Sequence, residues 1–464
     1  MKNKLQKSIL IAALAIFGLS DLLNAQTISA GGNHSLYRCS DNTVMSAGKN
    51  GDGQLGDGTN SDKTTPVQLS SLSDITAIAG GRNHSLFLKN DGTVWACGSN
   101  YYGQLGDGTN TNRTTPVQVS SLTGIIGIAG GDGHSLFLKN DGTVWACGIN
   151  YGNLGDGTTT NRTTPIMVLG LSGIIAIAGG NVHSLFLKND GTVWACGSNN
   201  FGQLCDGTTT TKTTPVQVSG LSGITSIAAG YYHSMFVKSG GTVWICGDNA
   251  FGKLGIGSSI YSVLTPVQVP SLIGIIAISG GYHHSLFLKN DNTAWACGYN
   301  AFGALGDGTT TDKSYPIQVS SLSGISSIAA GFGHSLFIKN NGTVWGCGAN
   351  NYGQLGNETT NTNSNYPLQV TGLCGAVSAI QENLMESLFS VYPNPSYGIF
   401  QLNFDYMPSS KGELEIYNVS GEKVYTAANI KQQMQIDLSI FPTGIYFVKV
   451  YDGTKIYNKK IVVQ

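Results

Sequence analysis

The sequence has little charge. Asp, Glu, Lys and Arg make up 11% of its 464 residues, and the formal net charge is −1; a typical soluble domain has ~25% charged residues. A protein that binds nucleic acid needs clustered Lys and Arg to neutralise phosphates. We therefore expect no nucleic-acid partner.

Long apolar runs are also scarce. An apolar stretch at residues 8–19 is short for a membrane span, and no other apolar run is long enough to cross a bilayer. This stretch follows Lys2, Lys4 and Lys7 and leads to Asn24-Ala25, which is the pattern of a secretory signal peptide. Residues 1–25 are therefore predicted to be a cleaved signal peptide, and a transmembrane anchor is the alternative. No Cys follows the apolar stretch, so we do not expect a lipoprotein anchor.

The nine cysteines lack the CxxC spacing typical of metal sites. Six of them share one position of a repeat: Cys97, Cys147, Cys196, Cys246, Cys297 and Cys347. Symmetry would place these six beyond disulfide reach of one another, so we predict small, buried, unpaired side chains. Cys205 replaces a Gly of the repeat. Cys39 and Cys374 lie in the first and last repeats, and we hypothesise that a disulfide joins them.

What the sequence has in abundance is a repeat of about 50 residues. A His recurs in steps of 49 to 51 residues, at His34, His84, His134, His183, His233, His284 and His334. A fixed period of this length indicates a propeller or another repeat array. The 64 glycines fit such a turn-rich β structure.

Each repeat contains four expected strands, which in the second repeat are residues 75–79, 85–89, 93–97 and 116–119. Asp91-Gly92 between two apolar runs is a hairpin signal, because both residues adopt positive φ at low cost. The strands are apolar on both faces, so each sheet is expected to lie between two neighbours, as a propeller blade does.

The motifs Gly-x-x-His-Ser, Gly-Thr-Val-Trp-x-Cys-Gly-x-Asn and Gly-Gln-Leu-Gly-Asp-Gly resemble the regulator of chromosome condensation repeat. The resemblance implies an all-β fold with a seven-bladed β-propeller, which we assign to residues 26–380, followed by a linker at 381–390. Residues 27–29 and 375–380 both resemble the first strand of a repeat, and either could close the ring.

Residues 391–464 are predicted to form a small, Ig-like β-sandwich domain. Val391-Tyr392-Pro393-Asn394-Pro395 opens it, expected strands cover 399–404 and 444–450, and a hairpin turns near Asn418 to Gly421. This set resembles the C-terminal sorting domain of the type IX secretion system of Bacteroidota. The resemblance implies that the type IX machinery recognises the domain and cleaves it, leaving the protein secreted or on the outer-membrane surface. A small adhesive module is the alternative.

Each repeat pairs His with Ser, and several carry an Asp seven residues after the His, as in His84 and Asp91. These are the residue types of a hydrolase triad, but catalysis needs one site with unlike groups, whereas this set recurs. We therefore predict that the His is buried and ties one blade's backbone to the next, and the resemblance implies the same. We expect no catalytic residue and no cofactor.

Two further repeated features are predicted to be structural. Each Gly-Asp-Gly turn has one Asp, which is too few oxygen ligands for calcium, so we expect turns and no metal at Asp57, Asp107, Asp156, Asp206 and Asp307. An aromatic residue precedes the same Gly in six repeats and is predicted to pack between blades: Tyr102, Tyr151, Phe201, Phe251, Phe302 and Tyr352.

The two positions before each repeated His vary in chemistry, and they are predicted to line one face of the ring. The candidate binding residues at these positions are Arg82, Asp132, Asn181, Tyr231, Tyr232, Tyr282, His283 and Phe332. Aromatic and Arg side chains are common anchors of protein interfaces. Four of these residues are expected to form one aromatic arc: Tyr231, Tyr232, Tyr282 and Phe332. The alternative is that these turn positions drift without function.

These observations predict a secreted or surface-displayed, monomeric, non-catalytic binding protein with an unknown extracellular protein or glycan as partner. The resembling family includes a nuclear exchange factor, a role that the export signals make unexpected here. Two alternatives remain open. One is a secreted inhibitor of an extracellular enzyme such as a β-lactamase, and the other is a surface enzyme that acts on polysaccharide.

Overall fold

The computed structural model describes residues 26–374, 389–404, 413–418, 422–428, 430–451 and 456–464. The chain separates into two compact units between Gly375 and Ala376, and each unit is described by itself. Three predicted segments lie outside the described residues: the signal peptide 1–25, the possible closing strand 375–380, and the linker up to residue 388.

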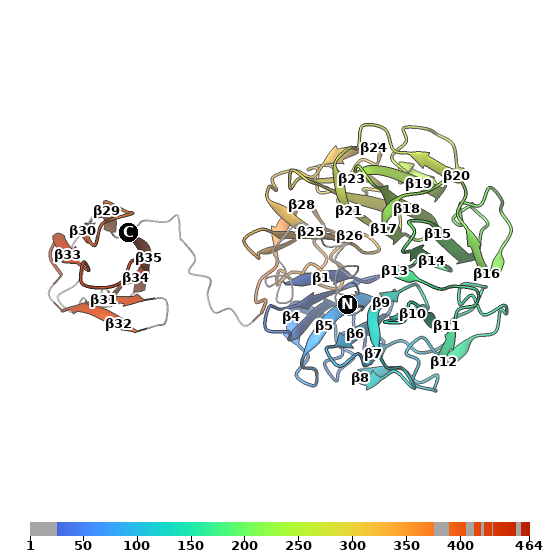
Figure 1. The fold of residues 1–464 in the computed structure, drawn as a ribbon, viewed down its shortest axis with the longest axis horizontal. Coiled ribbons are helices and arrows are strands. Elements are labelled where there is room, and N and C mark those ends of the chain that lie inside the picture. Colours follow the sequence, from blue (N-terminus) through green and yellow to red (C-terminus); the bar gives the residue numbers. More distant parts are fainter. Residues whose placement is uncertain (1–25, 375–388, 405–412, 419–421, 429, 452–455) are drawn as a thin grey trace, which may run out of the picture. The chain divides into compact units, whose positions relative to one another are not determined.

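Within residues 26–374, the strands form seven four-stranded antiparallel sheets that surround a common axis as the blades of a propeller (Figure 1). Each blade uses four strands that are consecutive in sequence. The seven-bladed, all-β fold predicted from the repeat is therefore confirmed.

The strand bounds are as follows. Blade 1 has β1 (Thr27–Ala30), β2 (His34–Arg38), β3 (Val44–Gly48) and β4 (Lys63–Gln68). Blade 2 has β5 (Ile75–Gly80), β6 (His84–Lys89), β7 (Val94–Gly98) and β8 (Arg113–Gln118). Blade 3 has β9 (Ile125–Gly130), β10 (His134–Lys139), β11 (Val144–Gly148) and β12 (Arg162–Met167). Blade 4 has β13 (Ile174–Gly179), β14 (His183–Lys188), β15 (Val193–Gly197) and β16 (Lys212–Gln217).

Blade 5 has β17 (Ile224–Ala229), β18 (His233–Lys238), β19 (Thr242–Asp248) and β20 (Ser262–Gln268), with the short 3-10 turn η2 (Ala250–Gly252) between its last two strands. Blade 6 has β21 (Ile275–Gly280), β22 (His284–Lys289), β23 (Ala294–Gly298) and β24 (Lys313–Gln318). Blade 7 has β25 (Ile325–Ala330), β26 (His334–Lys339), β27 (Val344–Gly348) and β28 (Ser364–Gln369).

The hydrophobic core lies between blades. Phe137 and Cys147 of blade 3 pack in one buried cluster with Leu86, Leu88 and Val94 of blade 2, and equivalent clusters join the other neighbours. A blade has apolar residues on both faces because each face is covered by another blade. This arrangement leaves the turns at the ends of the strands to carry surface chemistry.

Within residues 26–374, the ring closes without exchanging a strand. β1 pairs with β2 inside blade 1, and blade 7 takes all four strands from residues 325–369. Blade 1 instead packs on blade 7 through a shared cluster that includes Tyr37 and Leu336. A disulfide joins Cys39 to Cys374 across this closure, with Cα atoms 5.4 Å apart, as hypothesised from the sequence.

A second disulfide joins Cys205 to Cys246, with Cα atoms 5.8 Å apart. The prediction that Cys246 is unpaired is therefore wrong. The reason is the position of Cys205, where other blades have Gly: a Cβ placed on Gly106 would lie 3.0 Å from Sγ of Cys147 in the next blade. The remaining cysteines of this position are free and buried, as predicted: Cys97, Cys147, Cys196, Cys297 and Cys347.

The second unit contains two sheets. One has the order β29-β30-β33 and the other β32-β31-β34-β35. The strands are β29 (Phe389–Tyr392), β30 (Ile399–Phe404), β31 (Glu413–Asn418), β32 (Lys423–Ala427), β33 (Gln433–Asp437), β34 (Gly444–Tyr451) and β35 (Ile456–Val463). Side chains of both sheets share one buried core, which includes Leu402 and Val448. β29 begins inside the range predicted as linker.

Among the described residues, no helix is long and apolar enough to cross a membrane.

Candidate functional site

A closed ring of His–Ser contacts joins the seven blades. His84 Nε2 of blade 2 lies 3.0 Å from Ser135 Oγ of blade 3, and the series closes where His334 of blade 7 meets Ser35 of blade 1 at 3.1 Å. Ser135 Oγ in turn donates to the carbonyl oxygen of Gln104 at 2.6 Å. The serine hydroxyl has one proton, so it must accept its second hydrogen bond from the Nε2–H of a neutral imidazole.

The predicted structural role of the repeated His is therefore confirmed, although its direct partner is a hydroxyl and not backbone. Burial lowers the pKa of His84 to about 4, which keeps the ring neutral. Asp91 does not join this pair: its carboxylate accepts hydrogen bonds from Thr93 beyond the far end of β6.

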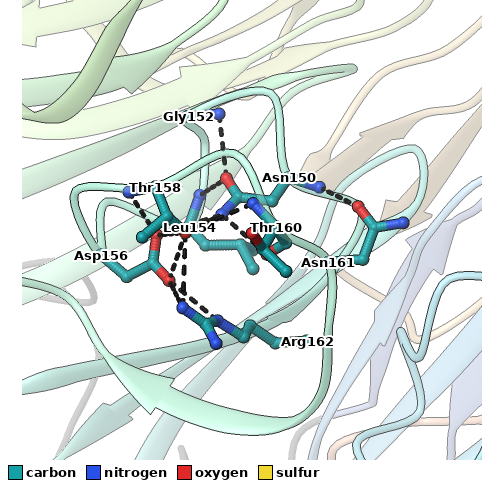
Figure 2. A network of polar contacts seen from close by, with 8 residues as sticks. All are labelled: Asn150, Gly152, Leu154, Asp156, Thr158, Thr160, Asn161 and Arg162. Atoms are coloured by element: carbon teal, nitrogen blue, oxygen red, sulfur yellow. Dashed lines mark hydrogen bonds and ion pairs between the residues drawn. The ribbon is translucent and has the colours of Figure 1, made fainter.

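The Gly-Asp-Gly turns form a repeated polar network, and Figure 2 shows the copy in blade 3. Asp156 accepts hydrogen bonds from Asn150 Nδ2 at 3.0 Å and from Arg162 Nη2 at 2.7 Å. Burial opposes ionisation of Asp156, but hydrogen bonds from Arg162 and Thr158 outweigh it and lower the pKa of this carboxyl. A basic residue lies equivalently near Asp57, Asp107, Asp206 and Asp307. Among the described residues, no cluster of three His, Cys, Asp or Glu could hold a metal.

The turn before each repeated His belongs to a belt of backbone hydrogen bonds around the axis. The amide of Arg82 donates to the carbonyl oxygen of Gly131 in the next blade at 3.2 Å, and Phe332 donates to Gly32 at 3.0 Å to complete the circle. The glycine beside the belt is required, since a Cβ on Gly81 would lie 2.1 Å from Cε1 of His84. The first variable position thus contributes its backbone to the ring, and its side chain is free to differ.

Six of the candidate binding residues line a shallow depression of about 90 Å³ at the mouth of the axis, and they come from six successive blades: Arg82, Asp132, Asn181, Tyr231, Tyr282 and Phe332. Arg82 Nη1 lies 3.4 Å from the Asp132 carboxylate. Asn181 contributes little surface, because it is only 7% exposed. The structure therefore gathers the predicted first positions on one face of the ring.

The predicted aromatic arc is contiguous. The ring centroids of Tyr231 and Tyr232 are 4.3 Å apart, those of Tyr231 and Tyr282 are 3.4 Å apart, and those of Tyr282 and Phe332 are 4.0 Å apart. All four side chains are half-buried, because they pack on one another at the mouth. Burial raises the pKa of Tyr231 to about 12, so this side chain stays uncharged.

The second variable position lies against the aromatic residue of the preceding blade. The rings of Tyr232 and Phe201 are 4.8 Å apart, and those of His283 and Phe251 are 5.1 Å apart. The predicted packing of these aromatics between blades is thus only partly right. Tyr102, Tyr151 and Phe251 remain 43%, 54% and 46% exposed, because they stand in turns at the rim of the face.

His283 also borders a buried ion pair that is unique to blade 5. Lys253 is fully buried and pairs with Asp248, and Lys253 Nζ lies 3.3 Å from His283 Nδ1. Burial and the Lys253 charge lower the pKa of His283 to about 4. His283 is therefore neutral, and it contacts the buried Lys253 as well as lying at the surface.

A larger cavity lies on the same face, and the sequence did not predict it as a separate site although several candidate binding residues line it. It has a volume of about 780 Å³ and is bordered by turns of blades 2, 3 and 4 and by the candidate residue Tyr232 of blade 5. Its aromatic walls include Tyr101, Tyr102 and Tyr151, and Arg82 and Asp132 form its axial side. The available signal was the double aromatic at Tyr101-Tyr102, since no other blade has two adjacent aromatic residues in this turn.

Family models match both parts of the chain. A model of the RCC1-like domain matches residues 122–384, and two models of the regulator of chromosome condensation (RCC1) repeat match residues 41–88 and 91–138, and residues 26–54 and 75–104. A model of the secretion system C-terminal sorting domain matches residues 390–464.

Solved structures share the propeller fold. Prp20p from Saccharomyces cerevisiae, described with its binding properties to Gsp1p and histones, is similar with a TM-score of 0.66 and 23% identity, over 77% of this chain and 90% of that chain. Human WBSCR16 is similar with a TM-score of 0.61 and 25% identity, over 67% of this chain and 85% of that chain. A search of curated proteins finds no match.

Proposed function

Because the chain belongs to the RCC1-like domain family and ends in a type IX sorting domain, we propose that it is a secreted or cell-surface, non-catalytic binding protein. Its binding surface is the face of the propeller that carries the variable turns. The sorting domain directs the chain to the type IX machinery, and the propeller is the part that acts outside the cell.

The observation that carries this proposal is that the backbone and the side chains of the turn before each His have separate roles. Backbone atoms of the turn close the ring by hydrogen bonds, while the side chains range from Arg82 and Asp132 to Tyr282. Constant backbone with varied side chains on one face is how a scaffold presents a recognition surface. The relation of yeast Prp20p to its protein partners supports use of an RCC1-like propeller for binding.

A capture experiment tests this function. The full chain would be immobilised and exposed to secreted and surface material of the producing bacterium and its neighbours. A face variant, Tyr231→Ser with Tyr282→Ser, removes the stacked pair at the mouth. The matched control, Tyr315→Ser with Tyr366→Ser, changes two tyrosines that are 55% and 49% exposed on outer strands β24 and β28.

We expect a ligand that the native chain and the control retain and that the face variant loses. Equal retention by all three proteins, at equal melting temperature, would contradict the proposal. If the retained ligand is an enzyme, assaying its activity with and without the propeller decides whether the chain is an inhibitor. If it is a polysaccharide, measuring its chain length over time decides whether the propeller cleaves it.

A further inference from the structure

We propose that the cavity between blades 2, 3 and 4 binds a neutral oligosaccharide. This inference rests on the proposed function, because the cavity opens on the same face, and it names one ligand class and one place on that face. Its volume of about 780 Å³ lies within the ~300–1,000 Å³ typical of clefts that hold small ligands. A protein partner would instead need a broad surface of ~800 Å² on each side.

The walls of the cavity offer the apolar half of sugar recognition. Tyr101 is 66% exposed, and Tyr102 and Tyr151 are 43% and 54% exposed. All three stand in turns of adjacent blades around one concavity. Exposed aromatic rings grouped on a secreted protein mark a binding surface. The flat face of a tyrosine ring packs on the C–H face of a sugar, and its hydroxyl stays in water.

The axial side of the cavity offers the polar half. Asp132 contributes carboxylate oxygens that contact Arg82 Nη1 at 3.4 Å, and ionised carboxylates have about four lone-pair sites. The Asp132 side chain keeps 22% of its surface and that of Arg82 keeps 47%. A sugar hydroxyl both donates and accepts, so neighbouring carboxylate and guanidinium groups can hold adjacent hydroxyls together.

The charge of the cavity selects a neutral ligand. Arg82 and Asp132 are its charged lining residues, and their charges cancel. The remaining polar lining comes from amides and hydroxyls, such as those of Asn200 and Thr159. A phosphorylated or polyanionic ligand would need an excess of Arg or Lys.

Blades 2 and 3 differ from the others in the turns that border the cavity. Blade 2 has Tyr101 where blades 4 to 7 have Asn200, Ala250, Ala301 and Asn351. Blade 3 has one residue fewer between its Asn150 and Gly152 than blade 2 has between Asn100 and Gly103. The middle turn is therefore shorter than its neighbour, and the Asn150 side chain binds the Gly152 amide directly at 2.9 Å.

The experiment is a calorimetric titration of the full chain with malto-, cello-, xylo- and mannohexaose as probes. The cavity variant is Tyr102→Ala with Tyr151→Ala. The control is Phe302→Ala with Tyr352→Ala, which removes the aromatic at the same position of two blades outside the cavity. A third variant, Asp132→Ala, removes the carboxylate.

We expect at least one hexasaccharide to bind the native chain. Removing the two rings on which the sugar packs should weaken that binding by about tenfold or more. The separate variant Asp132→Ala should also weaken it, while the control leaves it unchanged. Absence of binding to all four probes overturns the inference, as does equal weakening by the cavity variant and the control.

The capture experiment separates this inference from the broader function. A protein captured through Tyr231 and Tyr282, with no hexasaccharide binding, overturns the sugar site and leaves the binding function standing. Hexasaccharide binding without any captured protein supports both statements, because the sugar is then the partner. Failure of both experiments overturns both.

Discussion

At the scale of the residue, the repeated His shows how a reactive group becomes structural. Each imidazole is enclosed between blades and donates to a serine hydroxyl that is already committed to a carbonyl oxygen. Its other nitrogen, Nδ1, has no hydrogen-bond partner in six of the seven described residues of this kind. A proton on that nitrogen would be a buried charge without a counter-ion, which is unfavourable.

This arrangement predicts acid sensitivity. Burial lowers the pKa of His84, His183 and His334 to about 4 and that of His34, His134 and His284 to about 3. The unfolded value is ~6.5, so the unfolded chain binds protons first as pH falls. Stability is fully present above pH ~6.5 and is lost below it, by up to ~1.4 kcal/mol per pH unit for each His.

The measurement is urea unfolding of the full chain at several pH values from 7.5 to 4.5. The variant His84→Gln keeps a donor for Ser135 and removes one titrating group. The unfolded state of this variant should therefore bind about one proton fewer on acidification, and its free energy of unfolding should fall less steeply with falling pH. The paired carboxylates have lowered pKa values and act below this window. A stability that stays constant between pH 7 and pH 4.5 would contradict the ring of neutral histidines.

At the scale of the element, the hairpins and strands of each blade could be predicted from sequence. Asp91-Gly92 fixes a tight turn between β6 and β7, and the apolar runs on either side pair across it. The start of β8 at Arg113, three residues before the predicted start, was missed because Arg113-Thr114-Thr115 is polar. It pairs at the blade edge, where residues at both faces meet water.

The candidate site was only half predictable. The variable turns could be assigned to one face because each precedes the same His. The cavity was not predicted, because Tyr102 and Tyr151 were expected to pack between blades, whereas both stand exposed in turns at the rim of the face. The Cys205–Cys246 bond depends on a contact between blades, which no local pattern encodes.

Blade 5 permits a test of how one element tolerates a buried ion pair. Lys253 and Asp248 replace the Gln and Ser of blade 2, where Gln104 donates to Ser99 at 3.2 Å. Lys253→Met should lower the free energy of unfolding by ~3–5 kcal/mol, because it leaves the Asp248 charge buried and unpaired. Asp248→Ser with Lys253→Gln recreates the blade 2 pair and should cost less than ~1 kcal/mol.

Chemical denaturation at pH 7.5 measures both changes. Burial, the main cause of the lowered pKa of His283, remains in the double variant, and the Lys253 charge that lowers this pKa is removed together with the weaker opposing charge of Asp248. The pKa of His283 should therefore rise only slightly, which NMR titration would show. A single Lys253→Met variant as stable as the double variant would mean that Asp248 reaches water or another partner. The buried pair would then have no energetic role in the blade.

At the scale of the whole molecule, the propeller depends on joining its first and last blades. Packing between Tyr37 and Leu336 and the His334–Ser35 contact repeat what every other pair of blades has. No strand is shared between blade 1 and blade 7 in the described residues, so within them the backbone provides no link across the closure. The Cys39–Cys374 bond supplies that covalent link.

This predicts unequal effects of the two disulfides. The chain-entropy model gives ~6 kcal/mol for a sequence separation of 335 residues and ~4 kcal/mol for one of 41. Cys39→Ala with Cys374→Ala should therefore lower the melting temperature substantially and expose blades 1 and 7 to protease. Cys205→Gly should cost less, because it also relieves the left-handed backbone of Cys205 at φ 55°.

Melting curves, limited proteolysis and thiol counts in denaturant without reductant distinguish these effects. The native chain should show five free thiols, and Cys205→Gly should add one, from Cys246. Equal destabilisation by both changes would mean that the closure has no special dependence on its covalent link. A larger loss from the Cys39 and Cys374 variant, with cleavage starting at the terminal blades, would mean that the exported ring is held shut by a bond that forms only in an oxidising compartment.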